Sequence, residues 1–253
     1  MSDIYSTPNA SLVQASGDNN YGSIEKALAG DYTLDIGAIL SEAWAKTNGC
    51  KWTFQIALSI YLVIVLLALG VSALINTLIG FDASEASIIS SIGMQLPSQV
   101  LYMALTTPAF TGLSLLGLRR AAEAPIRAGQ ILNYYSKIVP LVLTAVITTL
   151  LMVVGYLALI LPGIYLSVAF LFAPLLVAEK GMNPLEAINT SRKAVSKKWF
   201  AMFGLGITIA LINVLGAIPL GIGLIWTVPM SMIAMGIAYR DMFGCEAATL
   251  SGA

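Results

Sequence analysis

Hydrophobic positions fill three long stretches of the chain, and short charged segments separate these stretches. Residues 52–118 contain only two charged side chains, Asp82 and Glu85, and residues 138–178 and 199–239 contain none. A helix needs about 20 apolar residues to cross the hydrocarbon core of a bilayer, so each stretch is long enough for two crossings. The pattern predicts six transmembrane helices, over residues 54–75, 98–118, 138–160, 164–178, 200–218 and 222–239.

Glycine and proline mark the points where the second and third stretches turn back. The second is interrupted by the Leu-Pro-Gly sequence of residues 161–163, and the third within residues 216–223, around Pro219. Proline ends a helix because it lacks the backbone donor, and glycine supplies the turn conformation. The six predicted helices therefore form three hairpins.

A short segment with helical spacing of its apolar residues precedes each hairpin. These segments cover residues 34–49, 119–137 and 183–198. Asp35 and Asn183 suit N-cap positions, and Pro184 suits the first helical position. The sequence thus predicts an all-α membrane protein with six transmembrane helices in three hairpins, each preceded by a cytoplasmic amphipathic helix.

Basic residues are distributed unevenly along the chain. All 13 Lys and Arg residues lie in the N-terminal region, the two basic connections or the C-terminal end. Such residues favour the cytoplasmic side of a membrane. We therefore expect the basic segments and both termini to face the cytoplasm. The chain has a polar flexible tail at 1–33, a transmembrane domain at 34–243 and a short C-terminal tail at 244–253.

Composition narrows the classes of function. The chain is 58% hydrophobic and 10% charged, with no net charge, whereas soluble domains carry about 25% charged residues. This balance gives no reason to expect a nucleic-acid partner. The chain has no histidine, and none of the six predicted spans contains an ionisable Asp, Glu, Lys or Arg. Catalysis within the membrane needs such groups, so we expect no catalytic residue, cofactor or metal site. Cys50 and Cys245 are expected to be reduced thiols.

Two predicted spans share a local pattern. Residues 106–119 and 227–240 both read Thr-x-Pro, then ten residues, then Arg. The match indicates either an internal duplication or a coincidence between two apolar helices. Pro108, Pro174 and Pro229 each fall in the second helix of a hairpin. These prolines either kink packed helices or frame a central cavity.

The third amphipathic segment carries four basic residues: Arg192, Lys193, Lys197 and Lys198. Near a membrane surface each is worth about 1 kcal/mol of attraction to anionic lipid. Helical spacing places Arg192 in the apolar arc between Leu185 and Trp199. We therefore expect Arg192 to extend to the interface, to pair with an acid such as Glu179, or to hold a lipid phosphate.

Residues 162–195 resemble the signature of the YciC-like bacterial inner-membrane proteins. The matching features are Pro162-Gly163-Ile164, Ala173-Pro174 and the Ala187-x-x-x-Ser191 helix with the basic residues that follow it. The run is also similar to the membrane domain attached to some glycerophosphodiester phosphodiesterases. The resemblance implies a six-helix bundle of the bacterial inner (cytoplasmic) membrane. It implies no catalytic residue, because the phosphodiesterase domain has no counterpart here.

Two functions remain open at this point. The leading hypothesis is a non-enzymatic multi-pass protein that acts as a scaffold or accessory subunit of a membrane complex, or as a binder of anionic lipid. The alternative is a transporter or channel for a neutral or lipophilic solute. A central cavity of several hundred Å³ favours transport, because small-ligand sites have that size. A bundle filled to its axis by side chains favours association.

Overall fold

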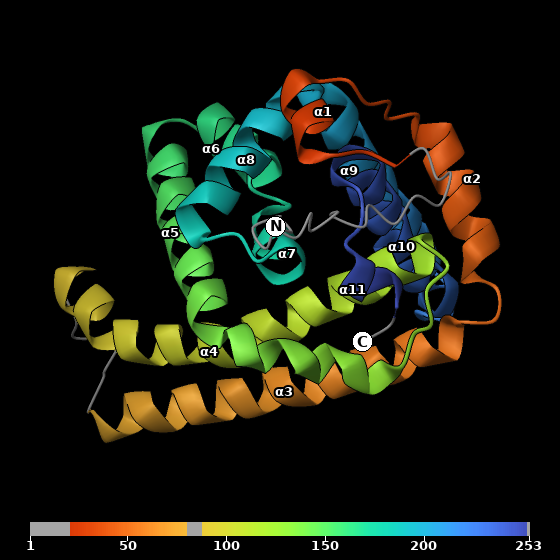
Figure 1. Ribbon diagram of the computed structural model, residues 1–253. Coiled ribbons are helices and arrows are strands. Elements are labelled where there is room, and N and C mark those ends of the chain that lie inside the picture. The colour runs from red at the N-terminus through yellow and green to blue at the C-terminus, as the bar shows by residue number, and fades with distance from the viewer. Residues whose placement is uncertain (1–20, 80–87, 252–253) are drawn as a thin grey trace, which may run out of the picture.

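The computed structural model describes residues 21–79 and 88–251, with the side chains of 88–94 left aside, and these residues form only helices and their connections (Figure 1). The all-α part of the predicted fold is therefore confirmed. The helices are α1 Ile24–Ala29, α2 Ile36–Thr47, α3 Lys51–Leu78, α4 Ile88–Ala121, the 3-10 helix η1 Ala128–Lys137, α5 Ile138–Ala158, α6 Ile160–Ala169, α7 Ala173–Lys180, α8 Pro184–Lys197, α9 Trp199–Ala217, α10 Leu224–Phe243 and α11 Ala247–Leu250.

Five helical segments of the described chain are long and apolar enough to cross a membrane. They are Lys51–Leu78, Gln95–Ala121, Ala128–Ala158, Ile160–Lys180 and Trp199–Ala217. In the first of these only 6% of the most apolar window is buried, against 50% in the second. Large apolar side chains on the outer surfaces of such helices suit a hydrocarbon solvent. The protein therefore has the helices of a multi-pass membrane protein.

The sixth predicted span, 222–239, coincides with α10, which is not among the five. Thr, Ser and Pro interrupt its apolar sequence, and Arg240 and Asp241 occupy its last turns. Of its 20 residues, 13 are buried, so this helix forms the core of the molecule. Helices α2, α4 and α9 pack around it. Its apolar side chains therefore face protein.

Helices α4 and α10, which carry the two matching segments, cross in close contact. A Cβ atom added at Gly236 would lie 2.5 Å from the backbone of Gly117, so only glycine permits this approach. Ile233 and Ile237 are fully buried beside the crossing. At this crossing α4 and α10 are thus in direct backbone contact.

The second apolar stretch bends at positions other than those predicted. Helix α5 ends before Leu159, whose backbone is extended, and α6 continues through residues 161–163. Pro162 is tolerated there because the first turn of a helix needs no backbone donors. The predicted span 164–178 is not one helix, since a turn at residues 170–172 separates α6 from α7.

A hydroxyl from a distant helix stabilises that turn. Ser191 of α8 is fully buried; its Oγ donates a hydrogen bond to the carbonyl of Ala169 at 2.8 Å and accepts one from the amide of Phe172 at 3.3 Å. Pro174 lies in the first turn of α7, where its missing donor is not needed. One α8 side chain thus satisfies both ends of the break.

The structure describes parts of both predicted tails, 1–33 and 244–253. Residues 21–33 form α1 and an extended segment, and the Tyr32 hydroxyl donates to the Ala194 carbonyl at 2.8 Å. At the other end, the carboxylate of Glu179 accepts hydrogen bonds from the Glu246 amide at 2.6 Å and the Thr249 hydroxyl at 3.1 Å. Residues 1–20 of the predicted flexible tail and the connection 80–87 lie outside the described residues.

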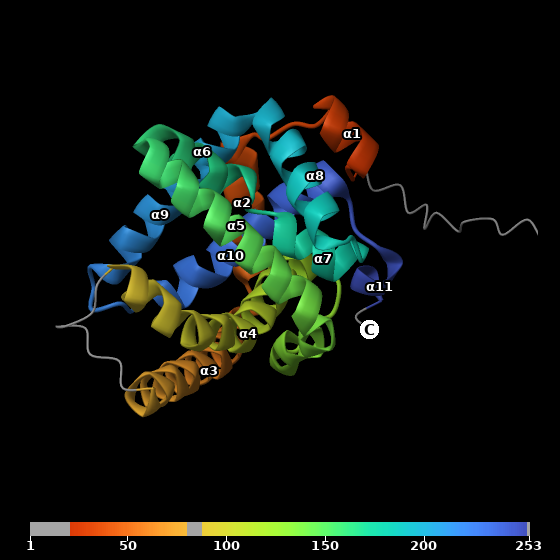
Figure 2. The same ribbon diagram turned by 90° about the vertical axis from the view of Figure 1, so that its left-hand side faces the viewer.

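Figures 1 and 2 together show how the helices are arranged. Helices α3 and α4 lie side by side in both views, and α5 crosses α4 steeply. Helices α1 and α8 pack against each other at the opposite end of the molecule from α3. Helix α8, which carries the basic residues, is therefore distant from α3.

Candidate functional site: the basic surface of helix α8

Helix α8 begins as the sequence predicts. The side chain of Asn183 accepts a hydrogen bond from the Glu186 amide at 3.1 Å, and Pro184 occupies the first helical position. The N-cap prediction for Asp35 in α2 is confirmed in the same way, by a 3.0 Å bond from the Ala38 amide. These caps fix where each helix starts and hence which side chains face the core.

The predicted apolar arc of α8 is wrong in one respect, and this changes the position of Arg192. Ile188 and Val195 are buried, but Leu185 is 67% exposed. The buried face is instead completed by small residues such as Ser191 and Ala194. Arg192 consequently lies outside the arc, is exposed, and donates to Asn189 Oδ1 at 3.1 Å.

Glu179 is not the partner of Arg192. Its side chain is fully buried, and its carboxylate accepts hydrogen bonds from the hydroxyls of Tyr239 and Thr249 and from the Glu246 amide. Lys180 Nζ lies 3.4 Å from the same carboxylate. Glu179 therefore anchors the C-terminal segment.

Three of the four predicted headgroup residues line one surface hollow of about 490 Å³. This basic hollow is lined by Leu28, Tyr165, Arg192, Lys193, Ser196 and Lys197. In the described part of the chain, no carboxylate lies within 4.0 Å of any of its three cations. Three uncompensated positive charges therefore meet at one place on the surface.

The wall of the basic hollow comes from a different helix. Tyr165 of α6 is hydrogen bonded through its hydroxyl to Ser196 Oγ at 2.6 Å. The indole N–H of Trp199 donates to the Tyr165 carbonyl at 3.2 Å, and the Trp199 ring stacks on Phe203 at 4.8 Å. Phe200, on the next position of α9, is 84% exposed. Aromatic rings beside cations are typical of the interface between headgroups and hydrocarbon.

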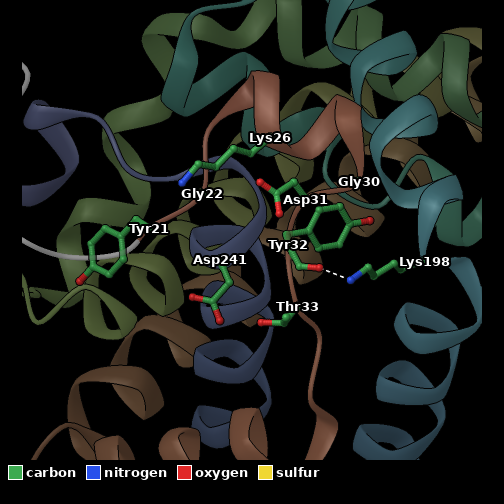
Figure 3. A pocket seen from close by; sticks show the side chains of 9 residues that line it. All are labelled: Tyr21, Gly22, Lys26, Gly30, Asp31, Tyr32, Thr33, Lys198 and Asp241. Carbon is green, nitrogen blue, oxygen red and sulfur yellow. Dashed lines mark hydrogen bonds between the residues drawn. The ribbon is translucent and has the colours of Figure 1, made fainter.

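Lys198, the fourth predicted residue, lies elsewhere. It borders a second hollow of about 490 Å³, lined by Tyr21, Gly22, Lys26, Gly30, Asp31, Tyr32, Thr33, Lys198 and Asp241 (Figure 3). Its ammonium donates to the Tyr32 carbonyl and lies 5.1 Å from the centre of the Tyr32 ring. Lys198 therefore holds the segment after α1 against α8.

This second hollow carries both signs of charge. Lys26 and Lys198 are balanced by Asp31 and Asp241, and Asp241 is 2.9 Å from the guanidinium of Arg240. Burial raises the pKa of Asp241. Burial also raises the pKa of Tyr32 to about 12, which keeps its hydroxyl protonated as a donor to Ala194. The second hollow offers an anion much less net charge than the basic hollow does.

An ion-pair cluster around the buried Arg240, which the sequence analysis missed, joins α2, α4 and α10. Arg240, 8% exposed, donates to both carboxylate oxygens of Glu42, at 2.7 and 3.1 Å, and to the Ala121 carbonyl at 2.8 Å. Lys46 lies 3.1 Å from Glu42 and 3.2 Å from Glu123. Burial acts to raise the pKa of Glu42, but the hydrogen bonds from Arg240 and Lys46 outweigh it and lower that pKa. The sequence offered one signal for this cluster: an arginine ends each of the two matching segments, residues 106–119 and 227–240.

The three prolines occupy different positions in their helices. Pro108 and Pro229 lie inside α4 and α10, whereas Pro174 begins α7. Only Pro174 borders the apolar cavity of about 130 Å³ between α4, α7 and α10. The carbonyl of Ile225, four residues before Pro229, accepts a 3.2 Å hydrogen bond from the side-chain amide of Gln55. A neighbouring helix thus satisfies the group that this proline frees.

Comparison with known proteins identifies no relative. The chain matches no protein-family model, no curated protein and no solved structure. Both cysteines are free, as predicted. Within residues 21–79 and 88–251, no three His, Cys, Asp or Glu side chains are grouped so that they could hold a metal ion. The site must therefore be interpreted from its own residues.

Proposed function

We propose that this protein is a non-enzymatic multi-pass protein of the bacterial inner membrane that binds anionic lipid through the basic hollow. The observation that carries the proposal is the meeting of Arg192, Lys193 and Lys197, without a carboxylate partner in the described chain, beside the half-buried ring of Tyr165. A phosphate accepts several charge-assisted hydrogen bonds at once, and the guanidinium of Arg192 presents donors with the geometry that phosphate oxygens need.

The expected strength follows from the number of cations. Each basic residue near an anionic membrane surface contributes about 1 kcal/mol, so three contribute about 3 kcal/mol. Since 1.4 kcal/mol is a factor of ten in affinity, the preference for an anionic over a neutral headgroup is about 100-fold at low salt. Lys198 adds little, because its ammonium already bonds to Tyr32.

The proposed topology counts α10 as a span, keeps both termini in the cytoplasm and has α5 and α6 form a hairpin beside α8, because Tyr165 of α6 is hydrogen bonded to Ser196 of α8 at 2.6 Å. Its support is the distribution of all 13 Lys and Arg residues outside the predicted spans. Helices α2 and α8, and the connection containing η1, then lie at the cytoplasmic surface.

A solute transporter is the weaker alternative. Helices α4 and α10 are in backbone contact at Gly117 and Gly236, which leaves no passage between them there. The cavity that Pro174 borders has only about 130 Å³. A small-molecule site usually has about 300 Å³ or more. A scaffold or accessory role in a complex with another membrane protein is compatible with lipid binding.

The experiment is native mass spectrometry of the full chain released from nanodiscs that contain equal phosphatidylglycerol and phosphatidylcholine. We expect wild type to retain phosphatidylglycerol and the Arg192→Ala/Lys193→Ala/Lys197→Ala variant to lose at least nine tenths of it. Arg127→Ala, at an exposed cation of another connection, is the control for loss of charge and should behave as wild type. Equal retention by the triple variant and wild type would refute the proposal.

A further inference from the structure

The apolar cavity lies between two candidate membrane spans and the core helix α10. It is enclosed by α4, by the turn between α6 and α7 together with α7 itself, and by α10, and its volume is about 130 Å³. The first two walls belong to the candidate spans Gln95–Ala121 and Ile160–Lys180. The third is the core helix α10. The cavity therefore belongs to the hydrocarbon-facing part of the molecule, apart from the charged surface of α8.

The lining presents no polar group to an occupant. The two hydroxyls of the α4 wall are already used, because Thr111 donates to the Thr107 carbonyl at 2.9 Å and Ser114 donates to the Phe110 carbonyl at 3.0 Å. The rest of the lining is apolar, including Phe172, Met232 and Met235. A buried water needs two to four polar partners, so the cavity does not suit water. Its occupant must be apolar.

The cavity opens sideways to the surface of the molecule. Phe110 and Leu171 line it and are 48% and 40% exposed, whereas Phe172 at its inner side is 1% exposed. In a membrane, the surface around Phe110 and Leu171 is in contact with lipid chains. Met232 and Met235 have flexible side chains that can adapt to the shape of an occupant. A neighbouring chain can therefore enter without crossing a polar barrier.

We propose that this cavity binds the terminal segment of one lipid acyl chain. An apolar cavity of about 150 Å³ holds a molecule the size of benzene, so this one fits roughly the last four or five carbons of a chain. The driving force is packing, because an empty cavity leaves its lining without partners for dispersion contacts. The site needs no charge, and so it goes beyond the proposed binding of headgroups in the basic hollow.

Photocrosslinking tests this site with a neutral lipid. The full chain is placed in nanodiscs of phosphatidylcholine that carries a diazirine at the end of one acyl chain, irradiated, digested and sequenced by mass spectrometry. We expect crosslinks at Phe172, Met232 and Met235. Ser114→Leu fills the cavity from α4 and should reduce these crosslinks at least fivefold. Ser59→Leu makes the same change on the exposed face of α3 and should leave them unaltered.

Further variants separate the outcomes. Ser114→Ala removes the hydroxyl but keeps the cavity open, so it should give the same crosslinks as wild type. Met235→Phe fills the cavity from α10 and replaces Ser114→Leu if that variant does not fold. Unchanged crosslinks in the filled variants, or crosslinks confined to Phe110 and Leu171, would overturn the assignment. Because the probe is neutral, the variant that lacks Arg192, Lys193 and Lys197 should label normally. A failure of headgroup binding is thus distinguished from a failure of the acyl-chain site.

Discussion

The α4–α10 crossing predicts a large effect of a single methyl group. Gly236→Ala would place a Cβ atom 2.5 Å from the backbone of Gly117, which lies nearly 1 Å inside an ordinary van der Waals contact. Backbone atoms cannot rotate away, so the two helices must separate along a buried contact. Overpacking of this kind costs about 1–3 kcal/mol, even though alanine is otherwise favoured over glycine in a helix by about 1 kcal/mol.

The matched control is Gly206→Ala. Gly206 lies inside α9, and no atom lies within 4 Å of an added Cβ, so this change should be neutral or stabilise the protein by up to about 1 kcal/mol. Thermal unfolding in mild detergent compares the two variants, at about 2–4 °C for each kcal/mol. We expect Gly236→Ala to unfold several degrees below wild type. Equal midpoints for the two variants would show that α4 and α10 do not pack as described.

The remaining predictions concern three polar contacts. Glu42→Gln weakens the bidentate bond to Arg240 and should cost about 1.5 kcal/mol at pH 7, the lower end for a charged hydrogen bond because Glu42 is 34% exposed. The folded-state pKa of Glu42 is lowered, so this stabilisation should be complete above pH 4.5 and disappear in acid, as measured by denaturation curves. A difference in stability between wild type and Glu42→Gln that persists at low pH would exclude a charge effect. Ser191→Ala leaves two buried backbone groups without a partner and should cost about 1–3 kcal/mol for each, seen as earlier thermal unfolding and faster proteolysis at residues 170–172. Gln55→Leu should cost about 0.6 kcal/mol in wild type and less in Pro229→Ala, whose amide restores the helical bond; equal costs in this double-mutant cycle would contradict the role of Gln55.

The length of an apolar run predicts where helices lie but not what surrounds them. The predicted spans 54–75 and 200–218 coincide closely with α3 and α9. Helix α3 faces outward, whereas α10 is the buried core, and both read as uncharged apolar segments. Hydropathy has the same sign for burial in protein and for burial in lipid, so only the Thr, Ser and Pro residues within α10 indicate that it packs against protein.

Contacts between distant residues were also beyond the sequence. The turn at residues 170–172 contains no breaker of its own, and it depends on Ser191, about 20 positions later. In the basic hollow, the three cations follow from the sequence of α8, but Tyr165 and Leu28 come from other helices. Arg192 was placed on the wrong face because helical periodicity assumes that every apolar residue packs, and Leu185 does not.

Lipid selectivity as a function of salt tests the central claim most directly. Spin-labelled phosphatidylglycerol and phosphatidylcholine are compared for association with the full chain in nanodiscs between low and high NaCl. Three exposed cations predict a strong preference for phosphatidylglycerol at low salt that declines as salt screens the charges, and no such preference after removal of Arg192, Lys193 and Lys197. A preference that is independent of salt, or that survives in the triple variant, would contradict binding at the basic hollow.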